Sequence, residues 1–497
     1  MTVGLRHLLK DPAVPDITLS DMTLDSRQIS PGDLFVALPG RNVDGRDFID
    51  AAFARGAAAV LTDKESEVGA KDIRILSVEG LPRRLGELAD RFYRSPSKNL
   101  KLMAVTGTNG KTSIVELTSQ MLRSQGYRAG SIGTLGMKLV ERPSEARNTT
   151  PDCVSLHRQL ATWCDAGVEW VVMEASSHAL DQGRLDGLAI DAGVFTNLSR
   201  DHLDYHPSME AYCTAKLRLF REFAPAVRIY NADDTALMPH RDAWGSAGIG
   251  ISCEGIEADV QVSVTGTAPL VLELKTIWGV RQIKSPLIGR FNAFNLSAAV
   301  TLLAAMGLPF EAVISAAEQA SPVCGRLQRV DFESDIAVFI DYAHTPDALH
   351  RALSALSELE VTGAIWVVFG CGGDRDRGKR AEMGAAAAGI ADRLVVTSDN
   401  PRSESPLAII DDILKGCRHV DPVVEADRAA AIGLAVSQAA PGDVVLIAGK
   451  GHETYQEVAG VRQPFSDNDH ALKSLAERRA AGRRCRGVSR SRSARSS

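Results

Sequence analysis

The sequence predicts an α/β fold with mostly parallel sheets. Short apolar runs typical of buried strands alternate with segments of helical apolar spacing through most of the 497 residues. At the usual domain size, this length corresponds to about three domains. Several predicted strands are followed directly by polar clusters, and ligands of parallel sheets bind at the carboxyl ends of the strands. With 45% apolar residues, the chain can bury ordinary globular cores.

A glycine-bracketed turn between a predicted strand and a predicted helix is the most informative segment. Residues 101–105 form an apolar run, and residues 113–125 place apolar side chains at helical spacing. A helix N-terminus after such a turn binds anions, the lysine reaches terminal phosphates and the following hydroxyl can ligate Mg²⁺. Val105 stands where the first glycine of the G-x-x-x-x-G-K-[ST] pattern is usual. The turn predicts a nucleoside triphosphate site formed by Gly107, Thr108, Asn109, Gly110, Lys111, Thr112 and Ser113.

Composition and motifs divide the chain into segments. Residues 1–98 hold short strands and turns and end in a linker near residues 94–99. Residues 99–325 contain the glycine turn, and a further α/β region covers residues 326–477. We expect buried strands at residues 169–173, 191–195, 337–340, 365–369, 394–397 and 444–448. The central region is therefore predicted to be a P-loop parallel-sheet domain, and the third region a Rossmann-like domain.

The C-terminal segment, residues 478–497, differs in charge from the rest of the chain. It carries eight arginines and no acid, so subtracting their charge from the net −6 leaves −14 for the preceding residues. With that acidic body, no nucleic-acid partner is expected. The segment has almost no apolar content, so we expect a disordered, solvated extension. A role at RNA or at a membrane surface is the alternative.

Composition also indicates the compartment. The eight cysteines are scattered singly with no C-x-x-C pair, as is typical of reduced core thiols. No apolar run is long enough to span a bilayer, and the N-terminus MTVGLRHLLKDP lacks the apolar core of a signal peptide. We therefore expect a cytoplasmic protein without a membrane partner.

Two polar clusters follow the strands expected near the glycine turn. Glu174 comes directly after residues 169–173, where a carboxylate can hold Mg²⁺ directly or through water. Residues 197–206 add two aspartates and two histidines. Such clusters also occur as hydrogen-bonded loops, but a sheet shared with the glycine turn favours a functional site. The histidine spacing matches no zinc pattern, so we expect Mg²⁺, held by Thr112, Glu174 and His202.

In the third region, four strand ends carry glycines and paired charges. The clusters occupy residues 341–346, 370–380, 399–402 and 449–453. Four such ends in succession indicate a ligand-binding face of the sheet. Because the charges are of both signs, this face suits a zwitterionic ligand better than a polyanion.

Taken together and in this order, TGTNGKT, NTTPD, EASSH, NLSRDHLDYH, DYAHTPD, DNPR and GKGHE closely resemble the motifs of the Mur ligases. These ATP-dependent enzymes build the peptidoglycan stem peptide. The resemblance covers nearly the whole chain except the tail. It implies an N-terminal domain for the UDP end of the substrate, a central ATPase domain and a mobile C-terminal domain. The sequence is most similar to members that add meso-diaminopimelate to UDP-MurNAc-L-Ala-D-Glu through an acyl phosphate, with ATP and Mg²⁺.

The resemblance also implies which residues bind each substrate. The UDP-MurNAc-dipeptide would contact Leu24, Ser26, Arg41, Asn42, Val43, Asn148, Thr149, Thr150, Ser176, Gln182 and Arg184. The adenosine end of ATP would contact Asn292, Arg326 and Asp341. The incoming diamino acid would contact Arg375, Asp399, Asn400, Pro401, Arg402, Gly449 and Glu453. Residues 41–43 depart from a common His-Gln-Ala, so backbone contacts are expected there.

Lys216 matches the carbamylated lysine of the family, which would help to hold a metal ion. Judged from its residue type alone, a lysine on a helix is usually a solvated or phosphate-facing cation. Three rival functions are a folylpolyglutamate synthetase, a switch that hydrolyses a nucleotide without an acceptor, and an RNA-associated ATPase that uses the arginine-rich tail. We expect a monomer.

Overall fold

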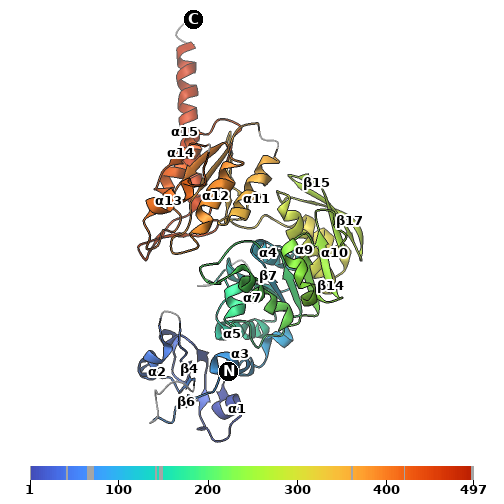
Figure 1. Ribbon diagram of the computed structural model, residues 1–497, viewed down its shortest axis with the longest axis vertical. Helices are drawn as coiled ribbons and strands as arrows, with labels where there is room; N and C mark the ends of the chain where they lie inside the picture. Colours follow the sequence, from blue (N-terminus) through green and yellow to red (C-terminus); the bar gives the residue numbers. More distant parts are fainter. Residues whose placement is uncertain are drawn as a thin grey trace.

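The structure is a computed structural model that describes residues 2–40, 43–63, 72–139, 143–144, 149–359, 362–418 and 420–493. Its three larger sheets follow one another along the long axis of the molecule, in chain order (Figure 1). The chain is therefore an α/β protein in three parts, as the sequence predicts.

The N-terminal part is built on a parallel sheet of four short strands. These are β3 (Met22–Thr23), β4 (Leu34–Val36), β5 (Ala59–Thr62) and β6 (Ile75–Ser77). The remaining elements are β1 (Val3–Gly4), α1 (Leu5–Leu9), β2 (Thr18–Leu19), η1 (Ser26–Gln28), η2 (Gly45–Phe48), α2 (Ile49–Ala54), α3 (Leu81–Phe92) and η3 (Pro96–Asn99). The predicted linker at residues 94–99 ends in the 3₁₀ turn η3, after two residues with positive φ.

The central sheet has eleven strands in the order β10-β9-β8-β11-β7-β12-β13-β14-β15-β16-β17. Their bounds are β7 (Lys101–Thr106), β8 (Ala129–Gly133), β9 (Gly136–Lys138), β10 (Pro143–Ser144), β11 (Trp170–Glu174), β12 (Ala192–Phe195), β13 (Val227–Asn231), β14 (Gly248–Ser252), β15 (Val260–Thr267), β16 (Leu270–Thr276) and β17 (Gly279–Ser285). In this spatial order, the seven strands β8-β11-β7-β12-β13-β14-β15 pair in parallel. At one edge β9 and β10, and at the other β16 and β17, pair antiparallel.

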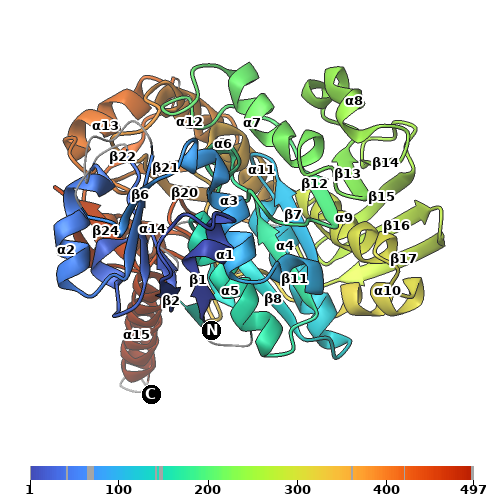
Figure 2. The same ribbon diagram turned by 90° about the horizontal axis from the view of Figure 1, so that it is seen from below.

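Helices cover both faces of this sheet (Figure 2). They are α4 (Lys111–Ser124), α5 (Cys153–Asp165), α6 (Ser177–Asp181), α7 (Met209–Arg221), η4 (Thr235–His240), α8 (Arg241–Trp244), α9 (Phe291–Ala305) and α10 (Phe310–Glu318). Along β7, Met103 and Val105 face the core formed with α4, α9 and α10. Leu102 and Ala104 face the core formed with α5, α6 and α7. Burial on both faces explains why this strand reads as one continuous apolar run.

The C-terminal sheet has six strands in the order β18-β19-β23-β20-β21-β22, parallel except for β18. The strands are β18 (Gln328–Arg329), β19 (Ala337–Asp341), β20 (Ile365–Phe369), β21 (Arg393–Val396), β22 (Val423–Val424) and β23 (Val444–Ala448), with the hairpin β24 (Tyr455–Val458) and β25 (Val461–Pro464). The helices are α11 (Pro346–Ser357), α12 (Gly378–Ala388), α13 (Pro406–Leu414), α14 (Arg428–Gln438) and α15 (Asp467–Ser493). The first three cover one face, and α14 and α15 cover the other.

Two expectations from the sequence are wrong. The segment from Arg478 onward was expected to be disordered, but helix α15 continues to Ser493 and projects from the body (Figure 1). The low apolar content of this segment prevents it from burying a core of its own. Arginine and alanine nevertheless favour helix, so the segment can continue the helix α15, whose first half packs on the body through Ala471 and Leu475. Arg478 itself donates to Asp335 and to the carbonyls of Val436 and Ala439. Cys324, expected among the core thiols, is exposed.

No helix in the described part of the chain is long and apolar enough to cross a membrane.

Candidate active site

The glycine turn lies at the carboxyl edge of the central sheet. Strand β7 ends at Thr106, and helix α4 begins at Lys111. Strands β11 and β12 flank β7 in parallel, with Glu174 opposite Val105 and Phe195 opposite Thr106. The loops that follow these strands therefore meet at the N-terminus of α4, where backbone N–H groups favour an anion.

The first glycine of the turn is required by both conformation and space. Gly107 has φ of +137°, and a Cβ there would lie 1.9 Å from Thr196 Oγ1. The Thr196 hydroxyl donates to the carbonyl of Asn109, and the Asn109 N–H donates to Asn197 Oδ1. The residues that follow β12 thus fix the conformation of the turn from one side.

Two lysines lie beneath the turn, Lys111 part-buried and Lys216 fully buried. Lys111 Nζ donates to the carbonyls of Gly107 and Thr108, at 3.0 and 2.7 Å. Lys216 Nζ, from α7, donates to the same Gly107 carbonyl at 2.6 Å and lies 4.3 Å from the ring centroid of Tyr212. Burial lowers the pKa of Lys111, although Glu174 and Asp201 oppose this shift. Burial and then the charge of Lys111 lower the pKa of Lys216 well below its ordinary value.

A chain of hydrogen bonds joins the turn to the neighbouring strand and to the C-terminal part. Arg326 Nη2 donates to Thr112 Oγ1 at 2.7 Å, and that hydroxyl donates to Glu174 Oε1 at 2.9 Å. Thr134 donates to both oxygens of Glu174, from its backbone N–H at 2.8 Å and from its hydroxyl at 3.2 Å. Among the described residues, every hydrogen-bond donor to this fully buried carboxylate is neutral.

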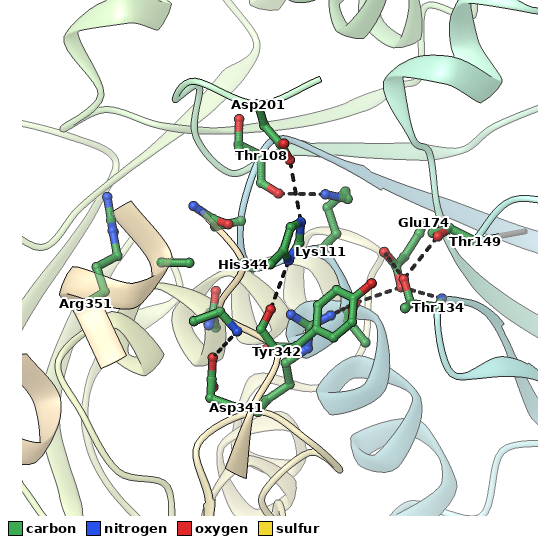
Figure 3. Close-up of a pocket in the computed structure, with 18 of the residues that line it drawn as sticks. Thr108, Lys111, Thr134, Thr149, Glu174, Asp201, Asp341, Tyr342, His344 and Arg351 are labelled. Carbon is green, nitrogen blue, oxygen red and sulfur yellow. Dashed lines mark hydrogen bonds and ion pairs between the residues drawn. The ribbon is translucent and has the colours of Figure 1, made fainter. Parts of the chain in front are cut away.

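A pocket opens between this edge and the C-terminal part (Figure 3). The central part contributes the turn, Glu174, Asp201 and Lys216, while the C-terminal part contributes residues 341–344 and Arg351. His344 Nε2 lies 3.8 Å from Asp201 Oδ2. Burial raises the pKa of Asp201, but His344, His202 and Lys379 outweigh it and hold the pKa well below its ordinary value.

His202 lies next to this carboxylate in an unusual backbone conformation. Its φ is +56°, and its Nε2 lies 3.4 Å from Asp201 Oδ2. Burial lowers the pKa of His202 to about 2, so its ring is neutral. Within the described residues, no group of three or more His, Cys, Asp or Glu side chains has metal-binding geometry.

Five of the residues expected at the muramoyl dipeptide lie in one network at the carboxyl end of β11. Thr150 Oγ1 donates to the Glu174 carbonyl at 2.7 Å, and Ser176 Oγ caps the N-terminus of α6. Arg184 donates to Gln182 Oε1 from Nε at 3.0 Å and to the Thr150 carbonyl from Nη1 at 2.8 Å. Thr149 Oγ1 accepts from the Thr134 hydroxyl at 3.3 Å. The structure thus brings these five residues together at the sheet edge.

The residues expected at the uridine lie in the N-terminal part. Leu24 packs against its core, and Ser26 begins η1. Val43 is exposed, and its carbonyl accepts from the Gly40 N–H. Arg41, Asn42 and Asn148 lie outside the described residues.

Of the residues expected at the adenosine, two line the pocket and one lies behind it. Arg326 and Asp341 line the pocket, whereas Asn292 lines a small neighbouring cavity of about 40 Å³. Asn292 Oδ1 accepts from Asn295, which does reach the pocket. Burial raises the pKa of Asp341 despite the nearby Arg326.

The residues expected at the diamino acid meet at the ends of β21 and β23. Asn400 Nδ2 donates to Glu453 Oε2 at 2.9 Å. Gly449 has φ of +118°, and a Cβ there would lie 2.6 Å from Asp399 Oδ2. That Oδ2 is buried without a hydrogen-bond partner among the described residues. The close approach of this carboxylate oxygen explains why residue 449 is a glycine.

The other two expected arginines differ in their contacts. Arg402, after Pro401, has φ of +52° and donates from Nη1 to the Gly373 carbonyl at 2.7 Å. Arg375 Nη1 lies 3.4 Å from Asp204 Oδ2 in the central part. Arg375 is therefore engaged in a contact between the two parts rather than in the cluster around Asn400.

Several pocket residues were not singled out from the sequence: Thr134, Asn295, His344 and Arg351. Thr134 and Asn295 lie outside any recognisable motif, and only the folded sheet brings them to the turn. His344 lies within DYAHTPD, so that motif was the available signal.

Three family models match the chain in succession. The Mur ligase family, catalytic domain, matches residues 18–93; the Mur ligase middle domain matches residues 105–303; and the Mur ligase, glutamate ligase domain, matches residues 325–451. The chain belongs to the Mur ligase family. Each matched segment of this Mur ligase covers most of one of the three larger sheets.

Two curated relatives cover nearly the whole Mur ligase chain. It is 43% identical over 473 residues to the UDP-N-acetylmuramoyl-L-alanyl-D-glutamate–2,6-diaminopimelate ligase of Coxiella burnetii, covering 93% of this chain and 96% of the relative. It is 44% identical over 495 residues to the Pseudomonas aeruginosa protein of the same name, covering 96% and 99%.

Solved structures agree on the fold. A structure named as the same ligase is 35% identical, with a TM-score of 0.67, covering 96% of this chain and all of that one. MurF from Acinetobacter baumannii, at 20% identity and TM-score 0.67, covers 96% and 99%. The Mycobacterium tuberculosis folylpolyglutamate synthase complexed with ADP and AMPPCP, at 20% identity and TM-score 0.60, covers 74% of this chain and 92% of that one. Because the last two structures are only 20% identical to this Mur ligase, they show that the fold is shared and nothing more.

Proposed function

We propose that this chain joins meso-diaminopimelate to UDP-MurNAc-L-Ala-D-Glu with the conversion of ATP to ADP and phosphate. The observation that carries the proposal is the pocket in which the phosphate-type turn, with Lys111, faces residues 341–344 at the end of β19 in the C-terminal part. The relatives at 43% and 44% identity are named for this reaction.

The residues around the turn suit activation of a carboxylate. A free carboxylate is a poor acyl donor, so its oxygen first attacks the γ-phosphorus of ATP, forming an acyl phosphate and releasing ADP. The amine then attacks the acyl carbon, loses a proton and expels phosphate. Catalysis of such steps is mainly positioning and neutralisation of charge, for which Lys111 and the N-terminus of α4 are placed.

The residues at the sheet edge also fit a magnesium ion. Mg²⁺ prefers oxygen ligands, and the buried Glu174 carboxylate with the Thr112 hydroxyl beside it offers them. When bound, Mg²⁺ would neutralise charge on the phosphates. His202 is neutral and lies close to Asp201, so it is available as a further ligand or as a donor to one.

The buried setting of Lys216 favours its carbamylation. A solvated cation is not the role of this side chain, because it is 1% exposed. With its pKa lowered, the neutral amine can add to the carbon of CO₂ and lose a proton, which yields an anionic carbamate. A carbamate would replace the repulsion between Lys216 and Lys111 by attraction. A phosphate-facing amine remains the alternative role.

The cluster at β21 and β23 would bind the diamino acid. Asp399 and Glu453 supply carboxylates for its ammonium, and Arg402 supplies a guanidinium for its distal carboxylate. The dipeptide would lie along Thr150, Ser176 and Arg184 after β11, with its UDP end in the N-terminal part.

We further propose domains at residues 1–98, 99–325 and 326–477, close to the matched segments. A cytoplasmic monomer fits a reaction that uses ATP and a UDP-linked precursor, because one chain supplies all the residues invoked.

The test is ADP formation by the purified protein with ATP, Mg²⁺ and UDP-MurNAc-L-Ala-D-Glu, with and without meso-diaminopimelate. We expect turnover and the tripeptide product only when both acceptor and donor are present. Turnover that does not depend on the amino acid would refute the proposal and favour a nucleotide-driven switch. Turnover with a folate acceptor would favour the folylpolyglutamate synthetase alternative.

A further inference from the structure

Lys450 is a fully buried lysine at the centre of the cluster that follows β21 and β23. Its side chain is 0% exposed. Its Nζ donates to Asn400 Oδ1 at 3.0 Å and to Glu453 Oε2 at 2.9 Å. A buried ammonium requires such partners, because leaving it unpaired would be costly. Lys450 therefore ties the turn at residue 400 to the loop at residue 453.

The hydrogen bonds around Lys450 define how Glu453 is oriented. Glu453 Oε2 accepts from both Lys450 and Asn400 Nδ2. Asn400 Oδ1 in turn accepts from Lys450 and from the backbone N–H of Glu457 at 2.9 Å. Within the described residues, Glu453 Oε1 accepts no hydrogen bond. One oxygen of this carboxylate is thus held by the protein, and the other is left for a ligand.

We propose that Lys450 is a positioning residue for the amino-acid acceptor. By holding Oε2 and the Asn400 amide, it keeps Glu453 Oε1 directed to an ammonium group of the ligand. The ligand class is a diamino acid, because the cluster also contains a guanidinium for a carboxylate. This inference rests on the proposed function, since it assigns how the same site binds its acceptor.

The test is Lys450→Met, which removes the donors and keeps the length of the side chain. We expect the Michaelis constant for meso-diaminopimelate to rise about tenfold or more, and those for ATP and the UDP-linked dipeptide to change less than about twofold. The control is Asp443→Ala, which removes the carboxylate that accepts from Trp366 Nε1 and from the Ala364 N–H at the opposite end of β23. It should lower the melting temperature without changing the Michaelis constant for the amino acid.

A double-mutant cycle separates positioning from general destabilisation. If Lys450 acts through Glu453, then adding Lys450→Met to Glu453→Gln should raise the Michaelis constant little further. Independent, multiplicative effects would overturn the inference, as would a Lys450→Met enzyme with an unchanged Michaelis constant for the amino acid. If Lys450→Met does not fold, Lys450→Gln is tested on the same readouts. Failure of this inference can be told apart from failure of the proposed function. In the second case, the wild-type protein itself would show no turnover that depends on meso-diaminopimelate.

Discussion

Replacing Arg402 with alanine should weaken binding of meso-diaminopimelate selectively. This amino acid differs from L-lysine by a second carboxylate at its distal end, beside the distal amine. A planar guanidinium can take such a carboxylate in a bidentate pair, which the ammonium of a lysine cannot do. The change should therefore raise the Michaelis constant for meso-diaminopimelate and leave that for ATP nearly unchanged.

The contacts of Arg402 give the size of the effect. Its Nη1 donates to the Gly373 carbonyl, and its Nε lies 4.0 Å from Glu457 Oε2, which is too long for a hydrogen bond. The Nε–H of Arg402 can therefore donate a hydrogen bond to a ligand carboxylate. Losing charge-assisted hydrogen bonds of about 1.5–3 kcal/mol corresponds to a rise of roughly 10- to 150-fold. The side chain is 24% exposed, so solvent screening favours the lower half of that range.

Arg462 is a matched control in the same part of the chain. Its Nε lies 3.8 Å from the same Glu457 Oε2, but its side chain is 63% exposed and stacks over the ring of Tyr455. Arg462→Ala should leave both Michaelis constants within about twofold, as is usual for a surface substitution. The assay is initial-rate ADP formation with saturating ATP and UDP-linked dipeptide and varied amino acid. Equal effects of the two substitutions, or efficient use of L-lysine by the wild-type enzyme, would refute the reasoning.

Four further changes test other parts of the structure. Lys111→Ala removes the part-buried cation of the turn and should lower turnover by about two orders of magnitude or more in the ADP assay, whereas near-normal ligation would contradict the assigned site. Gly107→Ala places a Cβ 1.9 Å from Thr196 Oγ1 at positive φ, so unfolding should show a loss of about 2–6 kcal/mol, and an unchanged melting temperature would contradict the geometry. Lys216→Ala should abolish activity, with partial recovery on adding small carboxylates; full activity without them, or a wild-type protein whose mass and density show no carbamate, would refute the modification. Truncation after Glu477 removes the Arg478 contacts to Asp335 and the end of α14 and should cost about 1–2 kcal/mol, while truncation after Ala481 should be neutral in stability and kinetics.

The sequence by itself determined the features that depend on short stretches of chain. Strands buried on both faces read as continuous apolar runs, so residues 365–369 and 444–448 match β20 and β23, and the other predicted strands match within two residues. The turn before α4 was predicted because an anion site at a helix N-terminus needs a local succession of strand, glycine and helix. The order of the motifs was sufficient for the family. The antiparallel edges of the central sheet were not predicted, because edge strands exposed on one side lack that continuous apolar signal.

Only the tertiary structure decided which distant residues share a charge or a hydrogen bond. Lys111 and Lys216 are far apart in the chain, yet both donate to the Gly107 carbonyl. Burial of Lys216, and then the nearby charge of Lys111, lower the pKa of Lys216. Lys450 lies within the GKGHE motif, but its role could not be predicted from it, because that role depends on Asn400, which folding brings from another loop, as well as on the nearby Glu453. Helix α15 likewise continues past Arg478, because that side chain finds acceptors on α14 that composition cannot reveal. Burial and pairing depend on contacts between segments, and these form only when the chain folds.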